Sequence, residues 1–449
     1  MKKLWDKGYI QNKELEEFCY LGDGNMDTNI VPHDVWGSIA HAKMLAKIGI
    51  LTDDEFKKLQ KSLVKILKLH EEGKFTVDMG DEDVHTKVEN FLIKELGDLG
   101  KKIHTGRSRN DQVLVDMRLY VKEQILITAQ RSLPVIEAFL AMAKKHEFVP
   151  MPGYTHMRRA MPSSVGLWAA SFAESLIDDL AILKNAYELN NQNPLGSGAA
   201  YGVSLSIDRE LTSKLLGFAK VQNNVLYGQA TRTKLQLLAM HAYVQIMLTL
   251  DRFASDMVLF TMKEFGFFSF PKEFFFGSSI MPQKMNFDAM ELLRARTNVM
   301  IGNHGIVASI SAGRISGYNA DFGDTKGPFV QSAMIVKGAL GVVEIVASAI
   351  KPNEENLKNA CTPEIYAAHQ AFLMVKKGMP FRDAYRKTAD SLDDLPELDP
   401  VDVLKETNHT GGPGNLGISK IASIMRTEEQ WWVKENAGFQ KAIQALVKE

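Results

Sequence analysis

The chain has 449 residues, with a hydrophobic fraction of 45%, a charged fraction of 24% and a formal net charge of −1. This composition is typical of a soluble globular protein, and the balanced charge excludes an electrostatic case for binding nucleic acid or an anionic membrane. The two cysteines, Cys19 and Cys361, have no metal-ligand spacing and form no disulfide framework. Because the N-terminus also lacks the apolar core of a signal peptide, we expect a cytoplasmic protein.

Residues 1–110 predict helices with charged faces, joined by loops. The clearest helix start is Thr52, where Glu55 completes a capping box three residues later. Apolar residues at Phe56, Leu59 and Leu63 then follow at helical spacing.

From Gln112 onward, long segments are almost free of glycine and proline and carry apolar residues at helical spacing. As one helix, the segment 229–265 would extend about 55 Å at 1.5 Å per residue. Apolar residues surround most of it, and such a helix must be buried on all sides. One chain of this size would struggle to surround several such helices, so we expect an oligomer with a shared core. The segments are 112–147, 163–190, 229–265, 287–312 and 329–350.

Strand signals are weak, because the chain shows no sustained alternation of apolar and polar residues. Residues 352–354 resemble a domain boundary, and beyond them lie shorter helical patterns, a glycine-rich loop at 410–414 and a polar C-terminal helix. We therefore predict an all-α protein of three domains. They are an N-terminal helical domain at 1–110, a central long-helix bundle at 111–352 and a small helical domain at 353–449.

Polar clusters interrupt the helical pattern at six places. If such a cluster lies at a helix N-terminus, free backbone N–H groups and the helix dipole favour an anion there. Arg109, Lys284 and Lys326, with the neighbouring hydroxyls and amides, suit a small polycarboxylate. The clusters are 81–86, 104–112, 153–159, 193–198, 277–286 and 318–326.

Each cluster also has a purely structural interpretation. His85 and His156 could be buried structural histidines, Arg109 a surface charge, and the glycines near 196 a turn. Tyr201 stands where a dinucleotide-binding fingerprint needs its third glycine. The chain contains no P-loop, no His-Glu-x-x-His and no Gly-x-Ser-x-Gly, so the sequence does not support ATP, zinc or a nucleophile elbow.

The stretch 277–286 resembles the signature loop of the fumarase/aspartase superfamily. Members of this superfamily reversibly eliminate an amine or a hydroxyl from a succinyl group and release fumarate. The segments 104–112, 153–159, 195–199, 208–210 and 380–382 are similar to the branch that splits argininosuccinate into arginine and fumarate. The resemblance extends from about residue 3 to about residue 412.

This resemblance implies a three-domain fold whose long-helix bundle is shared in a homotetramer. Each active site then combines segments from three subunits, and no cofactor or metal takes part. The expected partner is the small-molecule substrate argininosuccinate, without nucleic acid or membrane, and the pathway is arginine biosynthesis.

The chemistry explains the residue types in the signature loop. The proton to be removed lies next to a carboxylate, and its loss places a second negative charge on that group. A fixed cation and oriented donors must meet this charge as it develops, and Lys284 and Asn286 are the candidates. The resemblance implies that Ser278 is the base. A serine hydroxyl needs nearby amides and positive charge before it can act in this way, and closure of the loop over substrate would supply them.

The remaining roles follow from residue-level similarity to the family. His156 is the candidate acid or proton relay at the leaving nitrogen, since histidine titrates near neutrality. Glu291 is expected to orient His156. The expected substrate-binding residues are His85, Arg109, Asn110, Thr155, Ser279, Asn286, Tyr318 and Lys326.

The sequence departs from the family pattern in four places. Phe287 replaces the usual proline after the signature asparagine, Arg158 stands where a glutamine is usual, and Gly323 replaces a glutamine. A serine-bearing substrate loop expected between residues 18 and 37 is not recognisable.

Two alternatives stay open. One is a sister lyase that acts on another N-substituted aspartate, and the other is a catalytically silent structural protein, as crystallin relatives are. The intact set of Ser278, Lys284, Asn286 and His156 argues against the silent protein, because no structural need requires all four.

Overall fold

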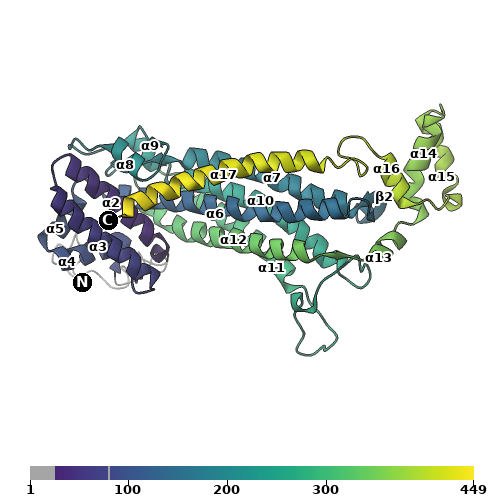
Figure 1. Ribbon diagram of the computed structural model, residues 1–449, viewed down its shortest axis with the longest axis horizontal. Helices are drawn as coiled ribbons and strands as arrows, with labels where there is room; N and C mark the ends of the chain where they lie inside the picture. Colours follow the sequence, from purple (N-terminus) through teal and green to yellow (C-terminus); the bar gives the residue numbers. More distant parts are fainter. Residues whose placement is uncertain (1–25, 79–80, 449) are drawn as a thin grey trace.

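Long helices form the centre of the molecule in the computed structural model, which describes residues 26–78 and 81–448. The helices that correspond to the five apolar segments of the sequence lie along the longest axis (Figure 1). The all-α prediction is therefore confirmed. The five helices are α6 (Arg109–Lys145), α7 (Val165–Asn190), α10 (Arg232–Phe260), α11 (Asp288–Ser311) and α12 (Lys326–Ala349).

The segment 229–265 is not one continuous helix, contrary to the sequence-based prediction. A short helix, α9 (Val225–Ala230), ends at Thr231, whose hydroxyl donates to the carbonyl of Gly228 at 2.7 Å. α10 then begins at Arg232 and ends at Phe260, before Gly266 reverses the chain with a φ of 56°. α10 is also not enclosed within one chain, since Leu248 is 40% exposed.

A group of shorter helices packs at the end of the bundle where α6 begins (Figure 1). The predicted capping box is confirmed there: Thr52 donates its N–H to Glu55 at 2.9 Å, and its hydroxyl accepts the N–H of Glu55 at 3.2 Å. The elements of this group are η1 (Asp27–Ile30), α2 (Val31–Lys47), α3 (Asp53–Glu71), α4 (Val84–Leu96), α5 (Asp98–Lys101) and η3 (Lys102–His104).

The cluster at 193–198 is a structural turn next to this end of the bundle. One carboxylate oxygen of Asp111 accepts the backbone N–H groups of Gly196 at 3.0 Å and Gly198 at 3.1 Å. Both glycines have a positive φ, which residues with a side chain rarely adopt. The neighbouring elements are β3 (Gln192–Asn193), α8 (Arg209–Leu215) and β4 (Lys220–Val221), and the two strands pair in parallel.

The opposite end of the bundle carries a β-hairpin that the weak strand signals did not reveal. β1 (Pro150–Thr155) and β2 (Arg158–Ser164) pair antiparallel directly after α6. A second antiparallel pair joins β5 (Phe268–Ser269) to β6 (Lys351–Pro352). Two short helices, η4 (Lys272–Phe274) and η5 (Ala320–Thr325), precede α11 and α12.

The C-terminal part of the chain divides into a small outer group and one long returning helix. α17 (Ile418–Val447) runs back along α6 and α7 and reaches α2 (Figure 1). Its Trp432 is fully buried against Tyr187 of α7, with ring centres 5.7 Å apart. By packing, α17 therefore lies with the central helices, and the division into three domains stays a prediction. The outer group contains α13 (Glu354–Asn359), η6 (Pro363–Tyr366), α14 (Ala367–Lys376), α15 (Phe381–Ala389), η7 (Leu392–Asp394) and α16 (Pro400–Glu406).

Two helical stretches are long and apolar enough to cross a membrane by length and composition alone. They are 109–145 and 320–349, and half or more of the most apolar window of each is buried inside the bundle. Core helices pass the same test, so this is weak evidence for a membrane span.

Candidate active site

A cavity of about 280 Å³ lies where α6, α10 and α12 begin. Each of these helices has a cation as its first residue, and all three cations, Arg109, Arg232 and Lys326, line the cavity. The dipoles of the helix N-termini add to this positive charge, so the cavity suits an anion. The other lining residues are Glu82, Asp83, Asn110, Val113, Met117, Gln236, Tyr318, Phe322, Gly323 and Thr325.

The acidic stretch before α4 holds the guanidinium of Arg109. Its Nη1 contacts the carboxylate of Glu82 and lies 3.4 Å from Oδ2 of Asp83. Its Nη2 donates to the hydroxyl of Thr86 at 2.6 Å. The side chain is still 25% exposed, so part of it remains accessible from the cavity.

A capping box fixes Arg109 and Asn110 in the first turn of α6. Ser108 is the N-cap residue, and its hydroxyl accepts the N–H of Asn110 at 3.2 Å. The N–H of Ser108 donates to Oδ1 of Asp111 at 2.8 Å. Such reciprocal bonds satisfy backbone N–H groups that the helix leaves unpaired, and they set the direction of its first side chains.

Asp27 joins Lys326 to the same acidic stretch. The Lys326 ammonium donates to Oδ1 of Asp27 at 2.6 Å, and Oδ2 of Asp27 accepts the N–H of Val84 at 3.1 Å. The side chains of Lys326 and Asp27 are 9% and 1% exposed. A buried ion pair of this kind holds its cation in one place at the edge of the cavity.

Arg232 is a site residue that the sequence pattern did not reveal, because it lies inside a segment predicted as a continuous helix. Its Nη2 donates to the carbonyl of Asn110 at 2.6 Å and to Gln229 at 3.1 Å. Its guanidinium carbon lies 5.1 Å from the centre of the Tyr318 ring, within cation–π range. Burial lowers the pKa of Arg232 to about 10, which leaves it charged at neutral pH.

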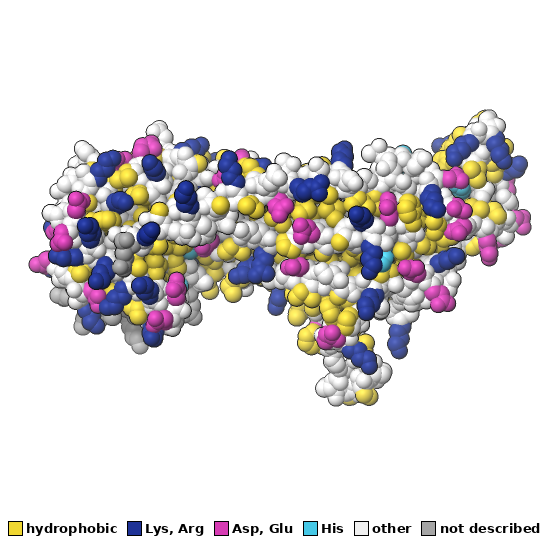
Figure 2. All heavy atoms as spheres, viewed as in Figure 1, with side chains coloured by type: hydrophobic (Ala, Val, Ile, Leu, Met, Phe, Trp, Pro, Cys, Tyr) yellow, Lys and Arg dark blue, Asp and Glu magenta, His cyan; other side chains and the backbone are white. Residues whose placement is uncertain are grey.

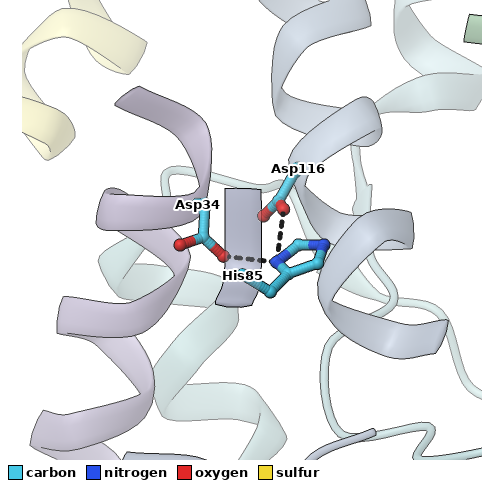
Figure 3. A group of neighbouring side chains, drawn as sticks. All are labelled: Asp34, His85 and Asp116. Carbon is cyan, nitrogen blue, oxygen red and sulfur yellow. Dashed lines mark hydrogen bonds and ion pairs between the residues drawn. The ribbon is translucent and has the colours of Figure 1, made fainter. Parts of the chain in front are cut away.

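His85 does not line the cavity, although we predicted that it binds substrate. Its side chain is 2% exposed and lies between Asp34 of α2 and Asp116 of α6 (Figure 3). The Nδ1 atom is 2.8 Å from Oδ1 of Asp34 and 3.6 Å from Oδ2 of Asp116. Direct contact with substrate stays a prediction, and the geometry gives His85 a supporting position next to the acidic stretch.

The signature loop 277–286 projects from the side of the bundle ahead of α11 (Figure 1). Backbone hydrogen bonds between Phe276 and Asn286, at 2.9 and 2.8 Å, close its base. The Ser278 hydroxyl accepts the N–H groups of Met281 at 3.2 Å and Ile280 at 3.4 Å. Ser279 and Lys284 are exposed. The Ser278 oxygen thus faces two amide donors, which is the environment that an alkoxide needs.

Aromatic side chains fasten the base of this loop. Phe287 is 5% exposed, and its ring centre is 5.0 Å from that of Phe270 and 5.2 Å from that of Phe275. The residue that departs from the family pattern therefore anchors the loop. Phe274 and Phe275 are half-buried, whereas Phe276 is 57% exposed. Only the first two residues of the aromatic run 274–276 therefore help to anchor the loop.

The predicted Thr155 and His156 lie at the exposed tip of the β1–β2 hairpin. His156 and Met157 are the two central residues of the turn, with φ values of 51° and 59°. The His156 side chain is therefore open to the surroundings of the chain. Glu291, in the first turn of α11, is also exposed. Among the described residues, no hydrogen bond or ion pair joins Glu291 to His156.

Three groups of predicted site residues thus lie apart within one chain. Arg109 and His156 are separated by the whole of α6, which extends about 55 Å. α11 and α12 are antiparallel, because Asn303 in the second half of α11 donates to Gln331 near the start of α12 at 2.9 Å, and η5, which leads into α12, also packs against α11. Counting along both helices places the start of α11 about 30 Å from Lys326 at 1.5 Å per residue. The structure brings together Arg109, Asn110, Tyr318 and Lys326, and it places the loop and the hairpin elsewhere.

The fold matches that of known enzymes. The solved structure of an EDDS lyase in complex with formate superposes on this chain with a TM-score of 0.84 at 22% sequence identity. The match covers 98% of this chain and 95% of the EDDS lyase chain. A class II fumarase from Schistosoma mansoni has a TM-score of 0.69 at 16% identity, with 84% of this chain and 91% of that chain covered. At these identities the likeness shows the fold alone, which this chain shares with both solved enzymes.

Sequence similarity then narrows the class. A family model described as a lyase matches residues 9–302. An argininosuccinate lyase from Thermotoga neapolitana is 41% identical over 389 residues, with 87% of this chain and 98% of the relative covered. One from Phocaeicola vulgatus is 39% identical over 427 residues, with 95% of each chain covered. The chain belongs to the argininosuccinate lyase family and is an enzyme of the lyase class.

Proposed function

We propose that this protein splits argininosuccinate into arginine and fumarate, as a step of arginine biosynthesis in the cytoplasm. The observation that carries the proposal is the convergence of Arg109, Arg232 and Lys326 on one cavity in a chain of this family. Argininosuccinate has three carboxylates, so its binding needs several fixed cations. Three helix N-termini, each beginning with a cation, meet that need.

Ser278 removes the proton from the carbon next to the carboxylate. The N–H groups of Ile280 and Met281 already point at its oxygen and stabilise the negative charge of the alkoxide. As the proton leaves, its electron pair moves onto the neighbouring carboxylate. Lys284 and Asn286 meet that charge when the loop closes over substrate.

The carbon–nitrogen bond then breaks, and the electrons on the carboxylate return to form the double bond of fumarate. The electron pair of the broken bond goes to the guanidino nitrogen, which takes up a proton and leaves as arginine. His156 supplies or relays this proton, since its exposed imidazole carries one nitrogen that can donate a proton and one that can accept it.

Active sites of this protein are composite and belong to a homotetramer. Ser278, His156 and Arg109 cannot meet within one chain, because the described helices hold them tens of ångströms apart, as their lengths imply. A site complete in all three parts needs neighbouring subunits. The exposed apolar side chains of α11 supply a surface for such contacts.

The Ser278→Ala variant tests the mechanism. We expect it to fold and to release fumarate at least about 100-fold more slowly, since a general base contributes at least that much. Fumarate absorbance measures the rate, and circular dichroism measures the fold. Ser171→Ala, which removes an exposed hydroxyl of α7, is the matched control. Fumarate release near the wild-type rate by Ser278→Ala would refute the assignment.

A substrate panel separates this function from its alternatives. Gly323 lines the cavity where the family usually has a glutamine, and this favours a sister lyase as the second candidate. Argininosuccinate, adenylosuccinate, aspartate and malate are compared by fumarate absorbance. Preference for argininosuccinate supports the proposal, preference for another compound identifies a sister lyase, and no fumarate from any compound identifies a silent relative.

A further inference from the structure

Three buried side chains from three helices meet beside the cavity (Figure 3). Asp34 comes from α2, His85 from α4 and Asp116 from α6, and each is at most 3% exposed. We propose that these residues form a positioning cluster that holds the acidic stretch 82–86, and through it both Arg109 and Lys326, in place for substrate. The inference rests on the proposed function, because its test measures turnover of argininosuccinate.

Several polar atoms of the cluster have no hydrogen-bond partner among the described residues. They are Oδ2 of Asp34, both carboxylate oxygens of Asp116 and Nε2 of His85. A buried carboxylate without partners is costly unless it takes up a proton or faces a cation. A carboxylate on Asp34, a positively charged imidazolium on His85 and a neutral carboxyl on Asp116 leave the cluster without net charge.

The directions of the pKa shifts agree with that arrangement. Burial alone lowers the pKa of His85, but the hydrogen bond and charge of Asp34, with smaller effects of Asp83 and Asp116, raise it to about 9. Burial and the charge of Asp34 raise the pKa of Asp116 well above its ordinary value. The other charged or titratable groups that face the cluster are Asp27, Asp83, Glu89, His104, Arg107 and Asp111.

The stretch 82–86 links this cluster to both cavity cations. His85 lies in the first turn of α4, and the bond to Asp34 fastens that turn to α2. On either side of His85, Glu82, Asp83 and Thr86 contact Arg109. The N–H of Val84 donates to Asp27, which in turn accepts from Lys326. A shift of the α4 N-terminus therefore moves the partners of both cations.

The backbone of the stretch needs such support. Glu82 has a φ of 70°, in the left-handed region that residues other than glycine rarely adopt. Strained backbone of this kind persists only where its surroundings hold it in place. The bond between His85 and Asp34 lies three residues away and supplies a fixed point.

A metal ion is the main alternative occupant of the cluster. One ligand atom from each of the three residues lies within 4.8 Å of the others, so their geometry alone would accept one. However, the half-buried Arg107 interacts electrostatically with both Asp34 and Asp116. A guanidinium in that place opposes the entry of a second cation, since two like charges repel strongly in a buried site.

Variants of His85 and Asp34 test the inference against a matched histidine. His33 also lies on α2, is 2% exposed and contacts Glu123 of α6 at 3.1 Å. We expect His85→Asn and Asp34→Asn each to raise the KM for argininosuccinate at least tenfold, with a smaller change in kcat. His33→Asn should leave KM unchanged. The effect of His85→Asn should be non-additive with that of Arg109→Lys, because both act on the same guanidinium.

Three results would refute the positioning role of the cluster. If Asp34→Asn leaves KM unchanged while His85→Asn raises it, His85 contacts substrate itself and the positioning role is refuted. Additive effects of His85→Asn and Arg109→Lys on KM would also refute the positioning role. So would the presence of one divalent metal ion per subunit in dialysed wild-type protein. Circular dichroism of each variant separates loss of the fold from loss of positioning, and Asp34→Asn keeps the test open if His85→Asn fails to fold. A wild type that releases no fumarate refutes the proposed function instead.

Discussion

His156 and Met157 both occupy the left-handed backbone region at the tip of the hairpin. Two consecutive residues with positive φ form the type I′ turn, which matches the twist of a two-residue hairpin. Glycine and asparagine usually fill it, so the pair His-Met stores strain. Strain of this kind is typical of functional sites, because it fixes a side chain in a direction that a relaxed turn would not give.

Substitutions at Met157 should report that strain. We expect Met157→Val to lower the free energy of unfolding by about 1 kcal/mol or more, since left-handed backbone is particularly unfavourable for a β-branched residue. Met157→Gly should not destabilise the protein, because glycine adopts this φ freely. Urea unfolding of the two variants measures the difference. Equal destabilisation by both would show that the Met157 side chain, and not its backbone, matters.

The protonation of His85 predicts a loss of stability as pH rises. Its pKa is raised from 6.5 to about 9 in the folded protein, so its stabilising contribution is fully present below pH 6.5 and is lost as pH rises through 9. A shift of this size corresponds to a few kcal/mol, on the order of 3. Asp116, whose pKa is also raised, acts in the same direction, because its neutral form is favoured in the folded state.

Thermal unfolding at pH 6.5 and pH 9.5 measures this effect. The melting temperature of the wild type should be lower at pH 9.5 than at pH 6.5, and the decrease should be smaller in His85→Asn. His33→Asn serves as the control, because it removes a different buried histidine on α2. The same pH dependence in wild type and His85→Asn would contradict a charged His85.

At the scale of elements, the aromatic base of the signature loop makes a direct prediction. Phe287→Ala removes a buried ring that packs on Phe270 and Phe275, whereas Phe276→Ala removes a largely exposed one. Replacing a buried phenylalanine with alanine typically lowers the free energy of unfolding by about 3–5 kcal/mol. Here the loss weakens the packing at the base of the loop. We expect limited proteolysis to cleave the loop 277–286 faster in Phe287→Ala than in Phe276→Ala or wild type.

Helices could be predicted from the sequence where the spacing of apolar residues alone indicates them. The long helices follow from apolar spacing, and the Thr52 cap follows from local chemistry. The break between α9 and α10 at Thr231 could not be predicted. It involves a hydrogen bond from the Thr231 hydroxyl, and threonine also occurs inside continuous helices. The hairpin was missed because His156 and Met157 carry none of the glycine or asparagine that signals a tight turn.

The candidate site shows the same division. Arg109, Asn110, Tyr318 and Lys326 were found through family motifs, and the structure brings them to one cavity. Arg232 belongs to no such motif, and its role depends on three helices starting at one place. Asp27 acts through contacts 57 and 299 residues away in the chain. Local patterns contain no information on contacts of that range.

At the scale of the whole molecule, apolar side chains remain exposed on the central helices. Leu292, Val299 and Ile306 repeat every seven residues along one side of α11 and are 52%, 44% and 47% exposed. Figure 2 shows hydrophobic side chains along the flank of the bundle from which the signature loop projects. An exposed apolar stripe of this length marks an association surface. A neighbouring subunit on this flank would cover the stripe and lie next to the loop.

If the loop of one subunit and the hairpin of another complete each site, two inactive variants should restore activity when mixed. We expect Ser278→Ala and His156→Asn to be inactive separately. After joint unfolding and refolding, mixed tetramers contain sites in which both residues are intact, and fumarate release should reappear. The matched control mixes Ser278→Ala with Lys284→Met. Both changes lie in the same loop, so every loop in that mixture is defective and activity should stay absent. No recovery in the first mixture would mean that each active site takes Ser278 and His156 from a single chain, and recovery in the control would mean that Ser278 and Lys284 of one site come from different chains.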